Sequence, residues 1–360
     1  PALFSAAGPI LVQRNHHLKM KEKEFMTSLK WPRWAAALGI ALAILVSSPA
    51  VQAASWSFAV LCDDRSSYST DNLPAYYDAT YGISPYFPNV VLALSREPGL
   101  DFVLFPGDLF RGKKPNVTGA QMAADLEQWK TYMLPVTNAG IPVYTVRGNH
   151  DAYEVTDPAN GTAASIWLDH ISQPGSAVNP MTQDSGAQNG FTFAFMHKGS
   201  LFVGLDEYVN GTATPSYDSA FLTAQLAQHA THKFVYAHQP VWNYKTTELG
   251  PAGLADDMNS RGVDLYFTGH VHSYQRIREA GYRFQEIIIG TGGAPQDDPT
   301  LTGADPNLTL MAYAGGTGTN ARFGYAIITV NDDGSIVSRM KFLDNPGDPQ
   351  STVTVFDSAL

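Results

Sequence analysis

Short apolar runs alternate with longer amphipathic segments along most of this chain. In the first half, the apolar runs are rich in β-branched and aromatic residues, which is typical of buried strands. In the segment 120–136, Met122, Leu126 and Trp129 recur at spacings of three and four, as on the buried face of an amphipathic helix. The first half is therefore predicted to have the order β-α-β-α-β, with strands at 56–61, 102–105 and 143–146 and helices at 87–95 and 120–136.

The second half continues the same pattern without a break. No repeat of fixed period and no long Pro/Ser linker divides the chain, so one domain at 54–360 is predicted. Strands that alternate with helices predict an α/β fold. Three loops rich in Gly, Pro, Asn and Thr, at 68–85, 179–188 and 295–318, are expected to shape a binding rim. The further predicted elements are strands at 191–195, 201–205, 233–236, 265–267, 284–289, 325–330 and 335–342 and helices at 219–229 and 251–260.

The first 53 residues differ from the rest of the chain. A polar stretch without a pattern comes first, then basic residues, an apolar run at 34–46 and small residues up to Ala53. This order is typical of a secretory signal peptide, so residues 1–53 are predicted to be upstream residues plus a signal peptide that is cleaved near Ala53. A secreted or periplasmic location follows. The apolar run is short for a membrane span, so no stable span is expected after cleavage, and a retained anchor helix is the alternative.

Composition argues against a disulfide-stabilised protein and against a nucleic-acid-binding protein. With 360 residues, of which 44% are hydrophobic, the chain can bury a large core without disulfides. The single cysteine, Cys62, cannot form an internal disulfide and is expected to be buried at the end of a strand. Asp and Glu outnumber Lys and Arg by 33 to 23, so direct binding to nucleic acid is not expected. The sequence carries no signal for an oligomeric state.

Five of the predicted strands end in residues that can bind metal ions. Sites in α/β sheets form at the carboxyl ends of the strands, so these side chains are expected to meet. Carboxylate, amide and imidazole ligands suit Zn, Mn, Fe or Co, and their number exceeds the needs of one ion. Two divalent or trivalent transition-metal ions are therefore predicted. The candidate ligands are Asp63, Asp108, Asn149, His238, His270 and His272.

These residues lie in five short motifs. The motifs are D-x-R at 63–65, GD at 107–108, GNHD at 148–151, AHQP at 237–240 and GHVHSYQR at 269–276. In this order, each after a strand, they resemble the motif set of calcineurin-like phosphoesterases, and the last motif with GTGGAP at 290–295 is similar to the purple acid phosphatase branch. The resemblance implies a four-layer α-β-β-α sandwich of two mixed sheets. It also implies that phosphate esters are hydrolysed by a metal-bound hydroxide at a dinuclear site.

The resemblance implies a role for each residue of the site. His150 would contact the scissile phosphate and stabilise charge or protonate the leaving oxygen, without binding metal. Asp108 would bridge the two ions. The other ligands would form two groups, Asn149, His238 and His270 on one ion and Asp63 and His272 on the other.

The chain departs from its relatives at two positions. Many calcineurin-like phosphoesterases have a His where this chain has Arg65, and purple acid phosphatases have a metal-binding Tyr where it has Arg111. Arginine cannot bind a metal, so the ion held by Asp63 lacks its usual additional ligand, and no tyrosinate-to-iron colour is expected. Both arginines flank the expected phosphate position and are candidates for phosphate recognition, with a structural ion pair as the alternative.

Two other functions fit the same residues. One is a phosphodiesterase or nucleotide-cleaving hydrolase, because the long loops determine the leaving group. The other is a non-catalytic phosphate-binding relative with a weakened first metal site, although the presence of His150 argues against it. In each case the expected partner is a small-molecule phosphate ester. Tyr274 and Arg276 would either line the pocket or pack beside it.

Overall fold

The computed structural model describes most of the chain after Ala53. The predicted signal peptide at 1–53 lies outside the described residues, as does most of the predicted loop at 179–188. The described residues belong to one compact unit, Gln52–Leu360. Within them, no helix is both long enough and apolar enough to cross a membrane. The described ranges are 54–71, 73–112, 117–157, 161–173, 175–180, 190–210, 214–244, 249–297, 307–317 and 321–359.

The first sheet has six strands in the order β13-β12-β11-β1-β2-β3. β1, β2 and β3 are parallel, because the intervening chain crosses over through helices, and β11, β12 and β13 extend the sheet in antiparallel pairs. The strands are β1 (Trp56–Val60), β2 (Leu100–Phe105), β3 (Val143–Thr145), β11 (Gly324–Val330), β12 (Ile336–Leu343) and β13 (Val353–Ala359).

The second sheet has seven strands in the order β10-β8-β9-β7-β6-β5-β4. Its centre, from β5 through β6 and β7 to β9, is parallel, and β4, β8 and β10 pair antiparallel. The strands are β4 (Phe193–His197), β5 (Ser200–Gly204), β6 (Lys233–Tyr236), β7 (Leu265–Thr268), β8 (Tyr274–Glu279), β9 (Gln285–Ile289) and β10 (Leu308–Ala314).

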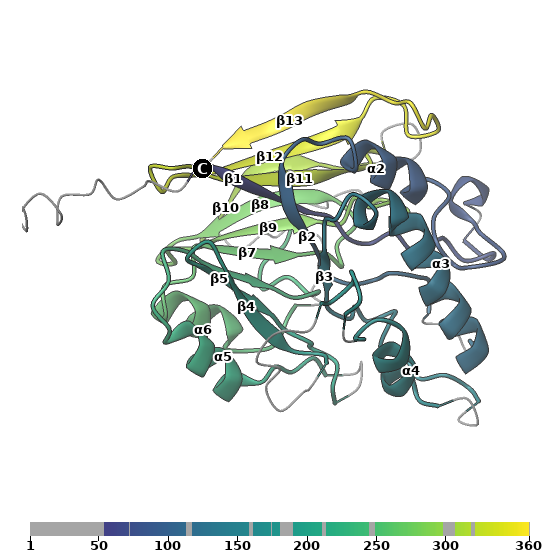
Figure 1. The fold of residues 1–360 in the computed structure, drawn as a ribbon, viewed down its shortest axis with the longest axis horizontal. Helices are drawn as coiled ribbons and strands as arrows, with labels where there is room; N and C mark the ends of the chain where they lie inside the picture. Colours follow the sequence, from purple (N-terminus) through teal and green to yellow (C-terminus); the bar gives the residue numbers. More distant parts are fainter. Residues whose placement is uncertain are drawn as a thin grey trace, which may run out of the picture. The chain divides into compact units, whose positions relative to one another are not determined.

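Alternating side chains on the central strands produce the layers. In β2, Phe102 points into the core between the sheets, whereas Val103 joins the core beneath α2, α3 and α4. In β5, Phe202 joins the core between the sheets and Val203 packs beneath α5 and α6. The predicted four-layer α-β-β-α sandwich of two mixed sheets is therefore confirmed (Figure 1). The helices are α2 (Phe87–Leu94), α3 (Gly119–Thr137), α4 (Ala163–His170), α5 (Ser219–Leu226) and α6 (Leu254–Ser260), with a 3-10 turn η1 (Pro74–Tyr76).

Side-chain caps fix the starts of three helices. Thr118, Thr162 and Asp218 each accept a hydrogen bond from the backbone N–H three residues further on, at the first turns of α3, α4 and α5. The sequence pattern predicted the apolar face of α3 correctly. It missed α4 altogether and extended α5 beyond its end at Leu226.

The elements that the pattern missed in the sheets are mainly at their edges. β10 falls within the predicted loop at 295–318, and β13 follows the last predicted strand. Most residues of both strands are partly or fully exposed, so neither forms the buried apolar run by which the central strands were predicted. β8 was missed because it is rich in polar residues although most of it is buried.

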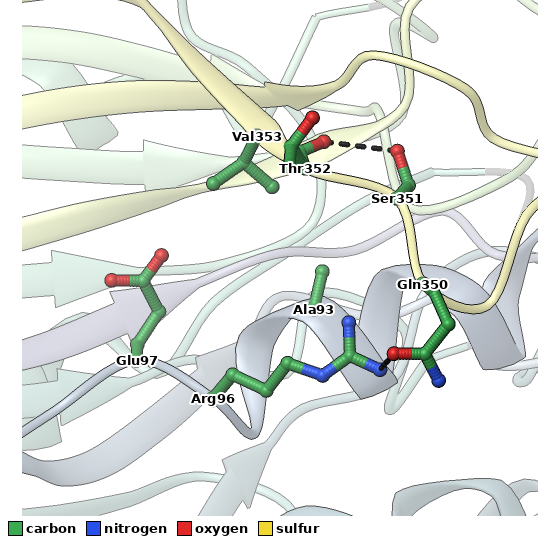
Figure 2. Close-up of a pocket in the computed structure, with 7 residues that line it drawn as sticks. All are labelled: Ala93, Arg96, Glu97, Gln350, Ser351, Thr352 and Val353. Atoms are coloured by element: carbon green, nitrogen blue, oxygen red, sulfur yellow. Dashed lines mark hydrogen bonds between the residues drawn. The ribbon is translucent and has the colours of Figure 1, made fainter.

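Hydrogen bonds from β8 and from the end of α2 attach β13 and the turn before it. Tyr274 and Arg276 both donate to the Asp357 carboxylate, at 2.7 and 2.8 Å, so these motif residues pack against β13. After the end of α2, Arg96 donates to the carbonyl oxygen of Pro349 at 2.7 Å and to Gln350 at 3.4 Å, beside a cavity of about 420 Å³ (Figure 2). The polar side chains that line this cavity already have hydrogen-bond partners within the protein, which indicates a structural role.

Candidate metal centre

One group of candidate ligands surrounds the side-chain oxygen of Asn149, which follows β3. This Oδ1 lies 3.1 Å from Nε2 of His238, which follows β6, and 3.3 Å from Nδ1 of His270, which follows β7. His238 is fully buried and Asn149 nearly so. Side chains from the two sheets therefore meet at the carboxyl ends of parallel strands.

A second group joins Asp63, which follows β1, to His272. Nε2 of His272 lies 3.5 Å from Oδ1 of Asp63. Asp108, which follows β2, connects the groups, because its Oδ1 lies 3.4 Å from Nε2 of His238. One ligand atom each from Asp63, Asp108 and His238 lie within 4.8 Å of one another. The distances thus bring all six candidate side chains together around one centre.

Backbone carbonyls determine which ring nitrogen of each histidine faces the centre. Nδ1 bonds to a backbone carbonyl oxygen at 2.8 Å in His238 and at 2.7 Å in His272. Because a carbonyl can only accept, Nδ1 carries a proton, and Nε2 faces an oxygen of Asn149 or Asp63. Two acceptors at such distances repel unless a cation or a proton lies between them. The donor set therefore fits metal ions held by oriented imidazoles.

Three candidate ligands have a left-handed backbone. The φ angles are 61° at Asp63, 58° at Asp108 and 65° at His270, a region that residues other than glycine rarely adopt. Such conformations persist where the surroundings enforce them, and they cluster at functional sites. Here the N–H of His270 donates to both carboxylate oxygens of Asp63, at 3.1 and 3.0 Å, and this contact ties the second sheet to the first.

Neighbouring residues approach the backbone so closely at two motif positions that only glycine fits there. A Cβ on Gly148 would overlap the carboxylate and the amide of Asp108, and one on Gly269 would overlap the Asp63 carboxylate and the Cys62 sulfur. Each motif therefore needs a residue without a side chain immediately before its ligands.

The ionisation of Asp63 suits a metal ligand. Burial acts to raise the pKa of its carboxyl, but the hydrogen bond to His272 and the charges of His238 and His272 outweigh burial and lower it to about 2. Asp63 is therefore a carboxylate at neutral pH. The neighbouring Cys62 is buried, as predicted, and its Sγ donates to Oδ2 of Asp63 at 3.0 Å.

His150 lies beside the two groups. Its Nδ1 lies 2.8 Å from the carbonyl oxygen of Arg111, so this nitrogen carries a proton. Its Nε2 lies 3.9 Å from Oδ2 of Asp108, a longer separation than that of the His238 ring. The ring therefore presents Nε2 toward the centre from a greater distance.

The structure places Arg65 and Arg111 in different environments. Nε of Arg65 lies 3.9 Å from Oδ2 of Asp108, and this buried nitrogen has no hydrogen-bond partner among the described residues. Arg111 instead uses Nη1 to donate to Ser66 Oγ, at 3.1 Å, and to the carbonyl oxygens of Ser67 and Asp78, both at 3.0 Å. Arg111 therefore holds together the segment that follows β1, whereas Arg65 directs a donor toward the centre.

Tyr68 is a residue of the site that the sequence pattern did not single out. Its hydroxyl lies 3.4 Å from Nδ1 of His150, and its ring centroid lies 5.9 Å from the guanidinium carbons of both Arg65 and Arg111. Burial raises the pKa of Tyr68 to about 12, so the hydroxyl stays protonated at neutral pH. The only advance signal was its place at the start of the predicted rim loop.

Two buried carboxyl groups position the candidate ligands through hydrogen bonds to the backbone. Asp151 accepts hydrogen bonds from the backbone N–H groups of Asp108 at 2.7 Å, Leu109 at 2.9 Å and Gly148 at 2.7 Å. Glu207 does the same for His238, at 3.0 Å, and for the residue after it. Asp151 was visible as the last letter of GNHD, but without a role, and no motif marked Glu207. Both act through other residues and contact the backbone that carries the ligands.

Comparisons with known proteins find relatives of a single family. A family model for calcineurin-like phosphoesterases matches residues 80–274, which include five of the six candidate ligands. Purple acid phosphatase 23 of Arabidopsis thaliana is 26% identical over 202 residues, which are 52% of this chain and 42% of that protein. This chain therefore spans less than half the length of that curated relative.

Solved structures show the same fold. A purple acid phosphatase, PPD1, from yellow lupin seeds superimposes with a TM-score of 0.59 at 15% identity, over 87% of this chain and 55% of that one. PhoD superimposes with a TM-score of 0.56 at 13% identity, over 86% of this chain and 70% of that one.

Proposed function

We propose that this chain, which belongs to the calcineurin-like phosphoesterase family, is an exported metal-dependent phosphoesterase that hydrolyses phosphate esters at a dinuclear site. The observation that carries the proposal is the convergence of six side chains of types that can bind metal ions, in two groups that Asp108 would join. The relatives named phosphatases support the reaction class. The signal-peptide pattern at 1–53 supports export to a secreted or periplasmic location.

Each proposed metal site has its own ligands. The first site consists of Asp63 and His272, the second of Asn149, His238 and His270, and Asp108 belongs to both. When bound, the ions would lower the pKa of a water, so that it can attack phosphorus near neutral pH, and would counter the charge of the phosphoryl oxygens. The set of oxygen and nitrogen donors suits Fe, Mn, Zn or Co.

His150 is proposed to act on the substrate. Its Nδ1 is held by the Arg111 carbonyl, so only Nε2 can exchange a proton with the substrate. Nε2 lies close enough to Asp108 to reach a phosphate at the centre, where it would donate to the leaving oxygen or to a phosphoryl oxygen. Arg65 would orient the phosphate through the Nε group that it directs toward Asp108.

Metal removal tests the proposed reaction. The purified protein is expected to contain two metal equivalents, and exhaustive chelation should abolish the hydrolysis of 4-nitrophenyl phosphate until Zn²⁺ or Mn²⁺ is restored. Full activity of the metal-free protein would show that the reaction class is wrong. Faster turnover of bis(4-nitrophenyl) phosphate would identify a phosphodiesterase instead, and phosphate binding without turnover would identify a non-catalytic relative.

The proposed export has a separate test. The exported protein, analysed by N-terminal sequencing, should begin near residue 54.

Arg65→His is expected to increase occupancy of the first metal site and to raise KM for a phosphate ester by roughly 10-fold. The fixed charge of Arg65 repels a nearby cation, and an imidazole would remove that charge and supply a ligand. The same charge favours a phosphate oxygen, so its loss weakens substrate binding. The measurement is metal stoichiometry at limiting free metal, together with steady-state kinetics.

Arg65→Ala is the matched control for this prediction. It removes the charge without adding a ligand, so it should raise KM with a smaller gain in metal affinity. Equal metal affinity and equal KM in the parent protein and both variants would show that Arg65 contacts neither ion nor substrate.

A further inference from the structure

A second cavity of about 420 Å³ adjoins the candidate metal centre. It lies in the segment between β1 and α2, and its volume is in the range of small-molecule sites. Two of its large lining side chains, Tyr77 and Leu73, are 36% and 39% exposed. The lining residues are Tyr68, Ser69, Leu73, Pro74 and Tyr77.

Internal hydrogen bonds hold the wall of this cavity in place. Ser67 donates from its N–H to the carbonyl oxygen of Tyr76 at 3.0 Å, and from its hydroxyl to that of Leu73 at 3.0 Å. The guanidinium carbon of Arg111 lies 5.4 Å from the ring centroid of Tyr77, and this group also bonds to the backbone on both sides of the segment. The apolar side chains are therefore presented by an organised backbone.

Tyr68 connects the cavity to the reacting centre. Its side chain lines the cavity, while its hydroxyl lies 3.4 Å from the ring of His150, the residue proposed to protonate the leaving oxygen. The Tyr68 ring also lies 5.9 Å from the guanidinium carbon of Arg65, whose Nε lies 3.9 Å from Asp108, so Tyr68 borders both the cavity and the arginine that is proposed to orient the phosphate. Most of the described lining is apolar or aromatic, and Ser69 adds a side-chain hydroxyl besides those of the tyrosines.

We propose that this cavity binds the alcohol part of the phosphate ester and that it favours an alcohol with an aromatic ring. The proposal rests on the proposed function and specifies its substrate class. Tyrosine faces stack on or meet the edge of an aromatic ring, and Leu73 and Pro74 add apolar contact, whereas a short alkyl group would leave most of the cavity to water. Tyr77 and Leu73 are therefore specificity-determining residues.

Benzyl phosphate and ethyl phosphate provide the test, because both release an unactivated primary alcohol and they differ mainly in the ring. The parent protein is expected to have a higher kcat/KM for benzyl phosphate. Tyr77→Ala and Leu73→Ala should each reduce the ratio of the two kcat/KM values by roughly 3- to 10-fold. Tyr77→Phe should preserve it. Phe356→Ala removes an aromatic ring that is 50% exposed outside the cavity, and should leave the ratio unchanged.

Binding of phosphonates separates this inference from the proposed catalysis. Calorimetric titration of the metal-loaded protein with benzylphosphonate and ethylphosphonate should show the same preference and the same loss in both alanine variants, whether or not the protein turns over esters. An absent preference for the ring, or a preference that survives both alanine substitutions, would overturn the cavity assignment and leave the phosphoesterase proposal intact. Loss of preference in Tyr77→Phe as well would also overturn it, because the ring would then not be the contact.

Discussion

Replacing His150 by alanine is expected to lower kcat by roughly 10²- to 10⁴-fold while metal content stays nearly unchanged. The reason is geometric. Nε2 of His150 lies 3.9 Å from the nearest oxygen of Asp108, and the backbone N–H of His150 donates to Oδ1 of Asp108 at 2.9 Å, a bond that alanine also makes. The substitution therefore removes a proton donor and leaves the ligands in place. The measurement is kcat for 4-nitrophenyl phosphate, together with metal analysis of the same samples.

Asp108→Ala is the control for this prediction, because it removes a proposed metal ligand. The Oδ1 of Asp108 lies 3.4 Å from Nε2 of His238, and Asp108 also shares a cluster of ligand atoms, all within 4.8 Å of one another, with Asp63 of the other group, so its removal should empty both sites. If His150→Ala lost metal as completely as Asp108→Ala, His150 would be a ligand and its proposed role would be wrong.

Much of the centre could be predicted because its ligands are local to strand ends. Each of Asp63, Asp108 and Asn149 follows a buried parallel strand within a few residues, so the fold brings them together once the strands align. Periodicity identifies these strands because both their faces are covered. The exposed edge strands β10 and β13 lack this signal, and they are the ones that the sequence pattern missed.

Long-range contacts explain what the sequence could not distinguish. Arg65 and Arg111 were equivalent candidates, yet only the folded segment after β1 supplies Arg111 with three oxygen acceptors for Nη1. Tyr68 reaches His150 across a separation of 82 residues, and Glu207 reaches His238 across 31. Periodicity and motif spacing carry no information on contacts of this kind, because such contacts form only when the chain folds.

The centre also concentrates buried acidic groups. Asp63, Asp64, Asp108 and Asp151 are all at most 1% exposed, and both side-chain oxygens of Asp64 have no hydrogen-bond partner among the described residues. Burial, and next the charge of Asp151, raise the pKa of Asp64 well above its usual value. Such a cluster is unfavourable without positive charge nearby. Bound metal ions would supply that charge, so folding and metal binding are expected to be coupled.

Asp151→Ala is expected to weaken metal binding by roughly 10- to 100-fold, although Asp151 is not itself a proposed ligand. Its carboxylate accepts the N–H groups of Asp108, Leu109 and Gly148, and thereby joins the turn after β2 to the turn after β3. Alanine would leave three buried donors without an acceptor, and one such loss costs about 1–3 kcal/mol. The left-handed backbone of Asp108, with φ of 58°, would lose the bond that enforces it.

Glu97→Ala separates this positioning effect from general instability. Glu97 accepts from Lys341 at 2.7 Å and from Tyr325 at 2.7 Å, and none of these residues belongs to the candidate centre, so its loss should lower the free energy of unfolding without changing metal affinity. Calorimetric titration with Zn²⁺, paired with denaturant unfolding of the metal-free proteins, measures both quantities. If Asp151→Ala lost only stability, as Glu97→Ala should, its three hydrogen bonds would serve the fold alone. A selective loss of metal affinity would instead show that the backbone geometry of the two turns determines how well Asp108 and Asn149 bind.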